Sequence, residues 1–358
     1  MNRDRLWGIA AITVTSLLWG TTGTAATFAP DVGPLAIGAA ALGIGGLLQA
    51  AVALPALHRE RGTLRRRLGT VLLGAAAVAV YPLAFYSSMH HAGVAIGSVV
   101  SLASAPLASG LLERFVDLRP LSRWWMLAAG LGIAGSAALC ASTLDGPAAD
   151  AASTLLGIGL GLVAGAAYAS YSWVVHRLMT AGIGRAAAMG AVFGSGGGLL
   201  VPVLLLTGAP LIASAQNLAV AGYMALVPMF LGYLAFGVGL TKVSASTATT
   251  VTLTEPAVAT VLAVLIVGEH LGPLGWAGLG MIGLVLLLLA LAPTNTGPGA
   301  RSVQDPADTL SRRSASQAAD APLAVGRTKT WHARSWSPEQ HRGSGSPPRS
   351  SSRREATG

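Results

Sequence analysis

The chain has 358 residues, of which 53% are hydrophobic and only 10% are charged, and its mean hydropathy is +0.62. A soluble domain carries about 25% charged residues, so this composition excludes an ordinary soluble protein and favours a membrane protein. The formal net charge of +9 does not by itself indicate nucleic acid, because membrane proteins keep arginines on one side of the bilayer. We expect no nucleic-acid partner.

Apolar segments long enough to cross a bilayer follow one another along the chain. About 20 apolar residues in a helix span the hydrocarbon core. We count ten such segments, at 7–28, 33–57, 68–89, 92–112, 124–143, 154–175, 186–207, 217–239, 244–267 and 273–292. The first has no small-residue cleavage site after a short core, so we expect it to be retained. The predicted fold is all-α, a polytopic protein with ten transmembrane helices that contacts the lipid bilayer.

Basic residues lie in alternate connections between these segments. Thirteen Lys and Arg residues lie before the first segment and after the second, fourth, sixth and eighth, whereas the other connections hold none. Connections rich in Lys and Arg stay on the cytoplasmic side. We therefore expect both termini in the cytoplasm, which requires an even number of spans, and a location in the cell (inner or plasma) membrane.

The C-terminal residues 293–358 have a different composition. Ser, Pro, Gly, Arg and Asp replace the apolar pattern, and 10 of the 23 Lys and Arg residues lie there. We predict a disordered cytoplasmic tail. Upstream of it, the single cysteine, Cys140, allows no intrachain disulfide, and His90 and His91 lack a third metal ligand. We predict no metal and no cofactor.

An internal repeat appears when the chain is shifted by 150 residues. Residues 101–135 then align with residues 251–285, and Pro106 aligns with Pro256. Each proline lies in the fourth span of a five-span half, so we predict two repeats, 1–143 and 144–292. Because five is an odd number, the halves cross the membrane in opposite senses. Such an inverted five-plus-five repeat is found in many secondary transporters.

Two segments resemble a known family, the drug/metabolite transporter superfamily and its EamA-type ten-helix members. They are "LLWGTTGTAA" (17–26) and "EPAVATVLAVLIVGEHLGPLGWAGLGMIGLVLLL" (255–288), and the resemblance covers about residues 6 to 292. It implies export or exchange of small metabolites, often amino acids, without ATP. In the first half, Ser104 or Ala105 occupies the position equivalent to Glu255, so the resemblance does not imply that the halves bind symmetrically.

Glu255 and Pro256 lie near the middle of the ninth segment. Pro256 has no N–H, so the carbonyl of Thr252 loses its helical partner, and Pro106 does the same to Leu102. We predict helix breaks at both prolines. An ionised carboxylate at that depth costs at least about 2.5–3.5 kcal/mol, so we expect Glu255 to be protonated, paired or in a water-filled cavity. It either couples transport to protons, binds a substrate amine, or locks neighbouring helices as a neutral group.

Hydroxyl groups and aromatic rings accompany this carboxylate. Serine and threonine hydroxyls in membrane helices also bond back to helix carbonyls, and Trp19 can serve packing as well as gating or binding, so the alternatives stay open. We expect a central cavity built from spans 1, 3, 4, 6, 8 and 9. The predicted substrate-binding residues are Glu255, Trp19, Thr252, Thr249, Ser101, Tyr81 and Tyr168.

Together these features predict a secondary active transporter rather than an enzyme. The expected function is export of small-molecule substrates such as amino acids by alternating access, with protons as the coupling ion. One alternative is an exporter of organic cations or multiple drugs, for which a buried carboxylate is the expected partner. Another is a non-transporting sensor or scaffold whose tail recruits partners. The glycine-rich "FGSGGG" (193–198) has no histidine placed to activate its serine, so it predicts packing rather than catalysis.

Overall fold

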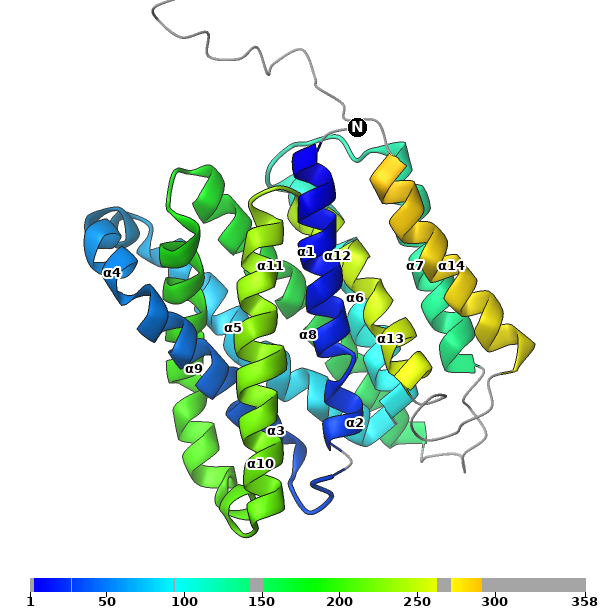
Figure 1. The fold of residues 1–358 in the computed structure, drawn as a ribbon, viewed down its shortest axis with the longest axis horizontal. Coiled ribbons are helices and arrows are strands. Elements are labelled where there is room, and N and C mark those ends of the chain that lie inside the picture. Colours follow the sequence, from blue (N-terminus) through cyan, green and yellow to red (C-terminus); the bar gives the residue numbers. More distant parts are fainter. Residues whose placement is uncertain (1–2, 27, 93, 142–150, 263–271, 292–358) are drawn as a thin grey trace, which may run out of the picture. The chain divides into compact units, whose positions relative to one another are not determined.

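Helices make up the regular secondary structure of the described part of the chain (Figure 1). The computed structural model describes residues 3–26, 28–92, 94–141, 151–262 and 272–291. These residues belong to one compact unit. The tail predicted over 293–358 and the predicted boundary between residues 143 and 144 lie outside the described residues.

The described residues of the first half form seven α-helices and one π-helical segment. They are α1 (Arg3–Trp19), α2 (Thr22–Ala26), α3 (Pro34–Gly38), π-helical η1 (Ala39–Ile44), α4 (Gly45–Arg66), α5 (Leu68–Ala92), α6 (Val94–Phe115) and α7 (Arg123–Ala141). The first predicted span consists of α1 and α2. The second consists of α3, η1 and α4.

The second half is divided in a similar way. Its elements are α8 (Ala151–Thr180), α9 (Arg185–Thr207), 3-10 η2 (Ala209–Ile212), α10 (Ala215–Met224), π-helical η3 (Ala225–Leu231), α11 (Gly232–Leu240), α12 (Ala245–Val251), 3-10 η4 (Thr252–Thr254), α13 (Glu255–Leu262) and α14 (Pro273–Leu291). The eighth predicted span consists of α10, η3 and α11. The ninth contains α12, η4 and α13.

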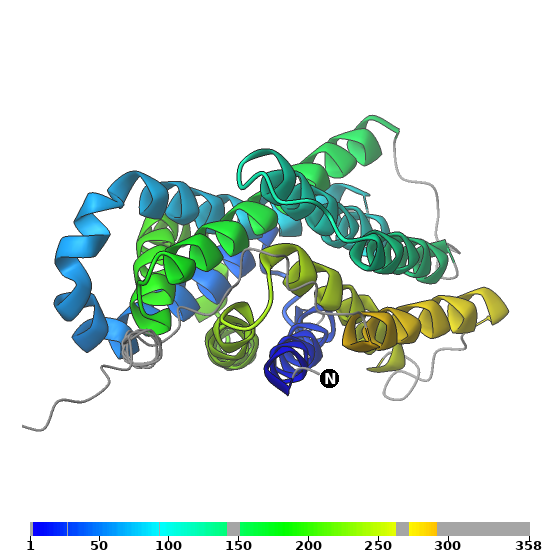
Figure 2. The same cartoon turned by 90° about the horizontal axis from the view of Figure 1, so that it is seen from above.

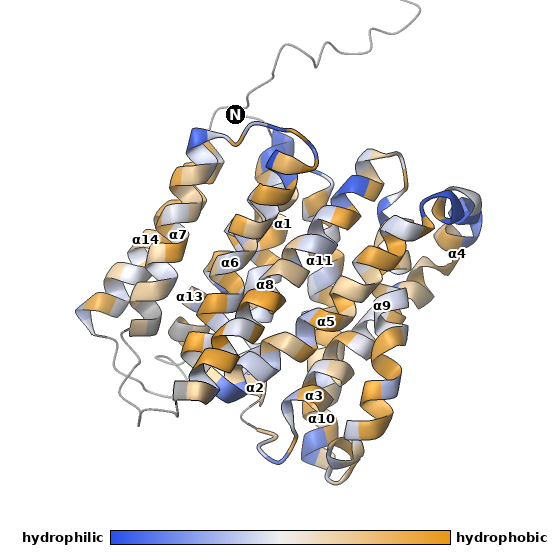
Figure 3. Cartoon of the chain, turned by 180° about the vertical axis from the view of Figure 1, so that it is seen from behind, coloured by the Kyte–Doolittle hydropathy of each residue, from blue (hydrophilic) through white to orange (hydrophobic). Residues whose placement is uncertain are grey.

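The apolar character of these helices confirms an all-α, polytopic membrane fold. Within the described residues, seven helical segments are long and apolar enough to cross a membrane, and Pro273–Leu289 is a shorter apolar helix. Each of the ten predicted spans contains a described helix, although ten crossings stay a prediction. Hydrophobic residues run along the helices, and hydrophilic ones gather near helix ends such as that of α4 (Figure 3).

Equivalent spans of the two halves pack against each other. In the described bundle, α4 lies along α9 and α7 lies along α14, at opposite edges (Figure 1, Figure 2). The pair α6 and α12 also consists of equivalent spans. Likewise α5 packs along α8, as α1 packs along α11. These pairings are those expected when two repeats are related by an approximate twofold axis.

The helix break predicted at Pro106 is wrong, because α6 runs through this proline without interruption. Proline removes one hydrogen bond from a helix, and a kinked helix can tolerate that loss. Serine hydroxyls add hydrogen bonds to the same helix. Ser101 Oγ donates to the Gly97 carbonyl at 2.7 Å, and Ser104 Oγ donates to the Ser101 carbonyl at 3.2 Å.

Candidate functional site

The first span changes direction at Gly20, beside the ninth span. Helix α1 ends at Trp19 and α2 begins at Thr22, whose Oγ1 donates to the Trp19 carbonyl at 2.7 Å. A Cβ at Gly20 would lie 2.7 Å from Cγ1 of Val258 and 3.1 Å from the Glu255 carbonyl oxygen. Because only glycine leaves room for this approach, the sequence "WGTT" brings Trp19 and Thr22 next to Glu255.

At Pro256 the ninth span tightens into a 3-10 turn. Helix α12 gives way to η4 at Thr252, and α13 begins at Glu255. The N–H of Glu255 donates to the Thr252 carbonyl, three residues back. The prediction that the Thr252 carbonyl has no backbone partner is therefore wrong, because the tighter turn supplies the hydrogen bond that proline removes.

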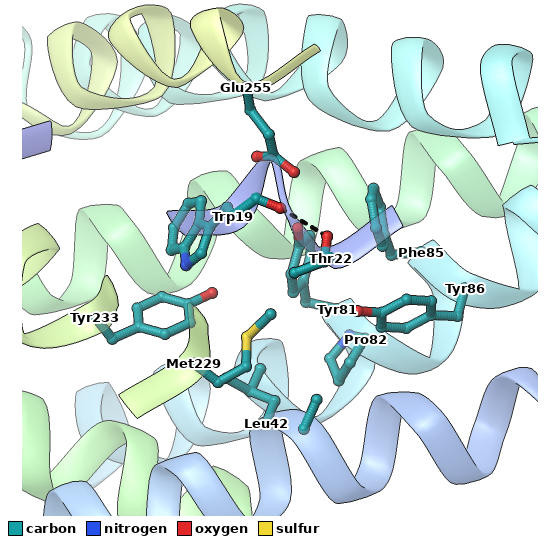
Figure 4. A pocket seen from close by; sticks show the side chains of 11 residues that line it. Trp19, Thr22, Leu42, Tyr81, Pro82, Phe85, Tyr86, Met229, Tyr233 and Glu255 are labelled. Carbon is teal, nitrogen blue, oxygen red and sulfur yellow. Dashed lines mark hydrogen bonds between the residues drawn. The ribbon is translucent and has the colours of Figure 1, made fainter. Parts of the chain in front are cut away.

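Glu255 projects from the start of α13 into a small pocket (Figure 4). The residue is 7% exposed, and its Oε2 atom is buried without a hydrogen-bond partner. The free space is about 10 Å³, which is room for about one water molecule. The pocket is lined by Trp19, Thr22, Ala41, Leu42, Tyr81, Pro82, Phe85, Tyr86, Met229, Tyr233 and Glu255.

Aromatic rings form much of the pocket wall and continue behind it. The ring centroid of Trp19 lies 4.8 Å from that of Tyr233 and 5.9 Å from that of Tyr168. Tyr81 lies 5.6 Å from Tyr168, whose hydroxyl shares a hydrogen bond of 2.8 Å with Thr252 Oγ1. The faces of aromatic rings attract cations. The pocket thus combines one carboxylate with ring surfaces that suit a positively charged group.

Both π-helical segments, η1 and η3, contribute lining residues. In η3, the N–H of Gly232 donates to the Val227 carbonyl, five residues back, instead of to Pro228. Trp19 Nε1 donates to the Pro228 carbonyl at 2.9 Å. The wider turn therefore fixes the indole in the wall. Short π-helical segments occur frequently at functional sites.

Comparison with known proteins identifies the family. The EamA-like transporter family matches the sequence twice, over residues 6–140 and 155–291. The chain belongs to this family. It is 34% identical over 284 residues to "Uncharacterized transporter YwfM" of Bacillus subtilis (strain 168), covering 79% of this chain and 93% of that protein. A solved structure described as "Crystal structure of protein" has the same fold, with a TM-score of 0.66 and 17% identity over 79% of this chain and 96% of its own.

This EamA-like transporter is a multi-pass membrane protein, and three of its predicted binding residues line the pocket. They are Glu255, Trp19 and Tyr81. Tyr168 lies behind them, packed against Trp19 and Tyr81. Thr252 connects to this group through its hydrogen bond to Tyr168. Substrate binding by these residues stays a prediction.

Thr249 and Ser101 lie outside the pocket lining. Thr249 Oγ1 donates to the Ala245 carbonyl at 3.0 Å and to Ser109 Oγ at 3.2 Å. Ser101 Oγ donates to the Gly97 carbonyl. The Thr249 hydroxyl therefore makes contacts within and between helices, and the Ser101 hydroxyl bonds back to its own helix, as such groups often do in membranes. Spans 4 and 6, expected to line the cavity, contribute none of its described lining residues.

The second and eighth spans both supply lining residues, but only one of these spans is marked by a recognisable feature in the sequence. The second span supplies Leu42 from the run "AAALGI", which contains no proline or polar residue to mark it. The eighth span supplies Tyr233, close to Pro228, and a proline inside a helix is a recognisable sign of irregular geometry. Among the described residues, no group of three His, Cys, Asp or Glu could hold a metal ion.

Proposed function

We propose that this EamA-like transporter exports small metabolites such as amino acids by alternating access, in exchange for protons at Glu255. The proposal is carried by the buried Oε2 atom of Glu255, which has no hydrogen-bond partner beside the pocket. An unpaired charge at this depth is unfavourable, whereas a proton or a substrate amine neutralises it. One carboxylate then serves both ligands in turn.

Because substrate and proton bind the same carboxylate, transport of one is coupled to transport of the other. A substrate amine that pairs with Glu255 replaces the proton, and a returning proton displaces the amine. Either ligand removes the isolated charge, so the pocket closes only when Glu255 is occupied. The two conformations then interconvert with one ligand or the other bound, and efflux of substrate accompanies entry of protons.

The orientation in the membrane determines at which end of the bundle substrate is loaded for export. The Lys- and Arg-rich connections favour a cytoplasmic position for both termini. We place the protein in the cell (inner or plasma) membrane, where protons enter the cell down their gradient. Export driven by this gradient therefore loads substrate at the arginine-rich end of the bundle.

Replacing Glu255 with glutamine tests the coupling. Purified protein in liposomes is first screened with radiolabelled amino acids, amines and nucleosides at two pH values, and the best substrate is retained. We expect a proton gradient to accelerate transport by the wild type but not by Glu255→Gln, because an amide does not bind the coupling proton. Asp31→Asn, at an exposed acidic residue outside the pocket, is the matched control. Normal gradient-driven export by Glu255→Gln would exclude Glu255 as the coupling group.

The aromatic rings around Glu255 favour a second candidate, export of organic cations or drugs. A cation over the face of Trp19 or a neighbouring tyrosine gains about 0.5–2 kcal/mol. Competition binding experiments distinguish the two candidate functions. If organic cations compete with protons for binding and amino acids do not displace them, cation export is the function.

A non-transporting sensor or scaffold makes a different prediction about the tail. Deleting residues 300–358 should leave flux unchanged in a transporter, since the family match ends at residue 291. A scaffold that recruits partners through its tail would lose its function on the same deletion. Flux through the shortened protein in liposomes distinguishes the two.

A further inference from the structure

Acidic residues of the first half bind the second half at one end of the bundle. Of the six Asp and Glu residues in the described ranges, four make such contacts, and all four lie near the arginine-rich connections. Hydrogen bonds that involve a charged group are roughly twice as strong as neutral ones. The four contacts are Asp4 with Lys242, Glu60 with the Gly184 N–H, Glu113 with Ser246, and Asp117 with Trp173 and Arg177.

Glu113 makes the most deeply buried of these contacts. It is 8% exposed, and Ser246 is 3% exposed. One carboxylate oxygen accepts from the Ser246 N–H at 2.8 Å, and the other accepts from Ser246 Oγ at 2.7 Å. One turn deeper, Thr249 Oγ1 donates to Ser109 Oγ at 3.2 Å. These two pairs form a seam between α6 of the first half and α12 of the second.

At the opposite end of the bundle, other groups form the hydrogen bonds between the two halves. Gln216 Nε2 donates to the Phe28 carbonyl at 2.7 Å, and the hydroxyls of Thr21 and Tyr223 share a hydrogen bond of 2.7 Å. Both of these contacts are exposed. In addition, Ser88 Oγ donates to the Gly157 carbonyl at 2.7 Å in a buried contact, and Ser153 Oγ donates to the His91 carbonyl at 3.2 Å. A typical neutral hydrogen bond adds less stability than one that involves a charged group. The described contacts between the halves at the arginine-rich end therefore use carboxylates, whereas these four contacts at the opposite end use hydroxyl, amide, carbonyl and imidazole groups.

We propose that Glu113 is a positioning residue for transport, which closes the arginine-rich end by holding the start of the ninth span against α6. Helix α12 is 7 residues long and leads directly through η4 to Glu255. Release of Ser246 from Glu113 frees α12 to move away from α6 and opens the seam toward the pocket. This inference rests on the alternating access in the proposed function, but not on the identity of the coupling ion.

A cysteine placed in the seam reports its opening. Ser109 is fully buried, and Cys140 is the single cysteine of the chain. The variant Ser109→Cys, in a Cys140→Ser background, is treated with a membrane-impermeant thiol reagent in inside-out and right-side-out vesicles. We expect slow labelling, from the cytoplasmic side alone. Glu113→Gln should raise that rate about tenfold, because it removes a charge-assisted contact.

Two further variants complete the test. Ser246→Ala keeps the backbone N–H and should raise labelling from the cytoplasmic side by a smaller factor than Glu113→Gln. Asp4→Asn changes an exposed pair, whose side chains are 69% and 38% exposed, and should leave the rate unchanged. Unchanged labelling in both Glu113→Gln and Ser246→Ala, or an equal rise from the two sides, would overturn the proposal. No substrate is used, so failure here is distinct from failure of proton coupling at Glu255.

Discussion

Trp19 and Glu255 line the same pocket, but their polar atoms are satisfied differently. The indole Nε1 donates to the Pro228 carbonyl, whereas Oε2 of Glu255 has no partner. A buried donor that is hydrogen-bonded holds its side chain in place, while an unsatisfied buried acceptor favours binding of a donor. The tryptophan is therefore a fixed part of the wall, and the carboxylate is the group that suits a ligand.

Replacing Trp19 with phenylalanine should destabilise the protein. The variant leaves the Pro228 carbonyl buried without its donor, which costs about 1–3 kcal/mol. Thermal unfolding of purified protein in detergent measures the change. Trp7→Phe, at a tryptophan that is 65% exposed, should leave the melting temperature nearly unchanged. Equal melting temperatures for both variants would show that the Trp19 hydrogen bond adds no stability.

Single residues differed in how well their positions could be predicted. A carboxylate or a tryptophan far from the membrane surface is unusual, so Glu255 and Trp19 were predictable members of the pocket. Hydroxyl residues are ambiguous, because each can bond back to its own helix. Thr249 and Ser101 take this second course, and no local pattern distinguishes them from residues that face a cavity.

Among whole helices, α4 and α9 show how glycine sets the packing distance. A Cβ at Gly46 would collide with the carbonyl oxygen of Phe193, and one at Gly197 would lie 2.7 Å from that of Gly43. Small residues let membrane helices approach closely and gain van der Waals contact. The glycine-rich composition that would weaken a helix in water therefore stabilises this pair.

Gly46→Ala should force these two helices apart. The added methyl group meets backbone atoms, which cannot move aside as a flexible side chain could, and overpacking of this kind costs about 1–3 kcal/mol. The matched control is Gly198→Ala on α9, where an added Cβ meets no atom within 4 Å. Melting temperatures in detergent should fall for the first variant only. A fall of the same size in the control would attribute the effect to the helix backbone instead.

Irregular helices were harder to predict than regular ones. Prolines mark the irregular segments at Pro228 and Pro256, yet α6 continues through Pro106. The segment η1 is π-helical without any proline. Whether a proline produces a kink, a 3-10 turn or a π-helical turn depends on which neighbouring groups satisfy the backbone, and these groups come from other helices.

Across the whole molecule, the two halves pair as equivalent spans but differ in chemistry. The first half supplies the four acidic residues at the arginine-rich end, and the second half supplies their partners. Glu255 has no carboxylate counterpart in the first half, where Ser104 or Ala105 takes its place. A single acidic residue thus faces a pocket that lies between two similar halves.

The predicted orientation can be measured with introduced cysteines. In a Cys140→Ser background, Gly62→Cys lies at the exposed arginine-rich end of α4, and Ala213→Cys lies in the exposed connection before α10. An impermeant thiol reagent added to intact cells should label Ala213→Cys and not Gly62→Cys, because basic connections stay in the cytoplasm. Reversed labelling would place both termini outside, and labelling of both or neither would contradict an odd number of crossings between them.

Composition and charge determined the membrane environment and the approximate spans, and the segments 17–26 and 255–288 carried the family resemblance. Hydrocarbon admits long apolar helices and leaves charged groups at their ends, so these features are visible in the sequence. Only the tertiary structure decided which face of each span turns toward the pocket. A helix in lipid is apolar on every side, so no amphipathic stripe marks its buried face. For this reason Leu42 lines the pocket without an obvious signal, while Thr249 and Ser101 lie away from it.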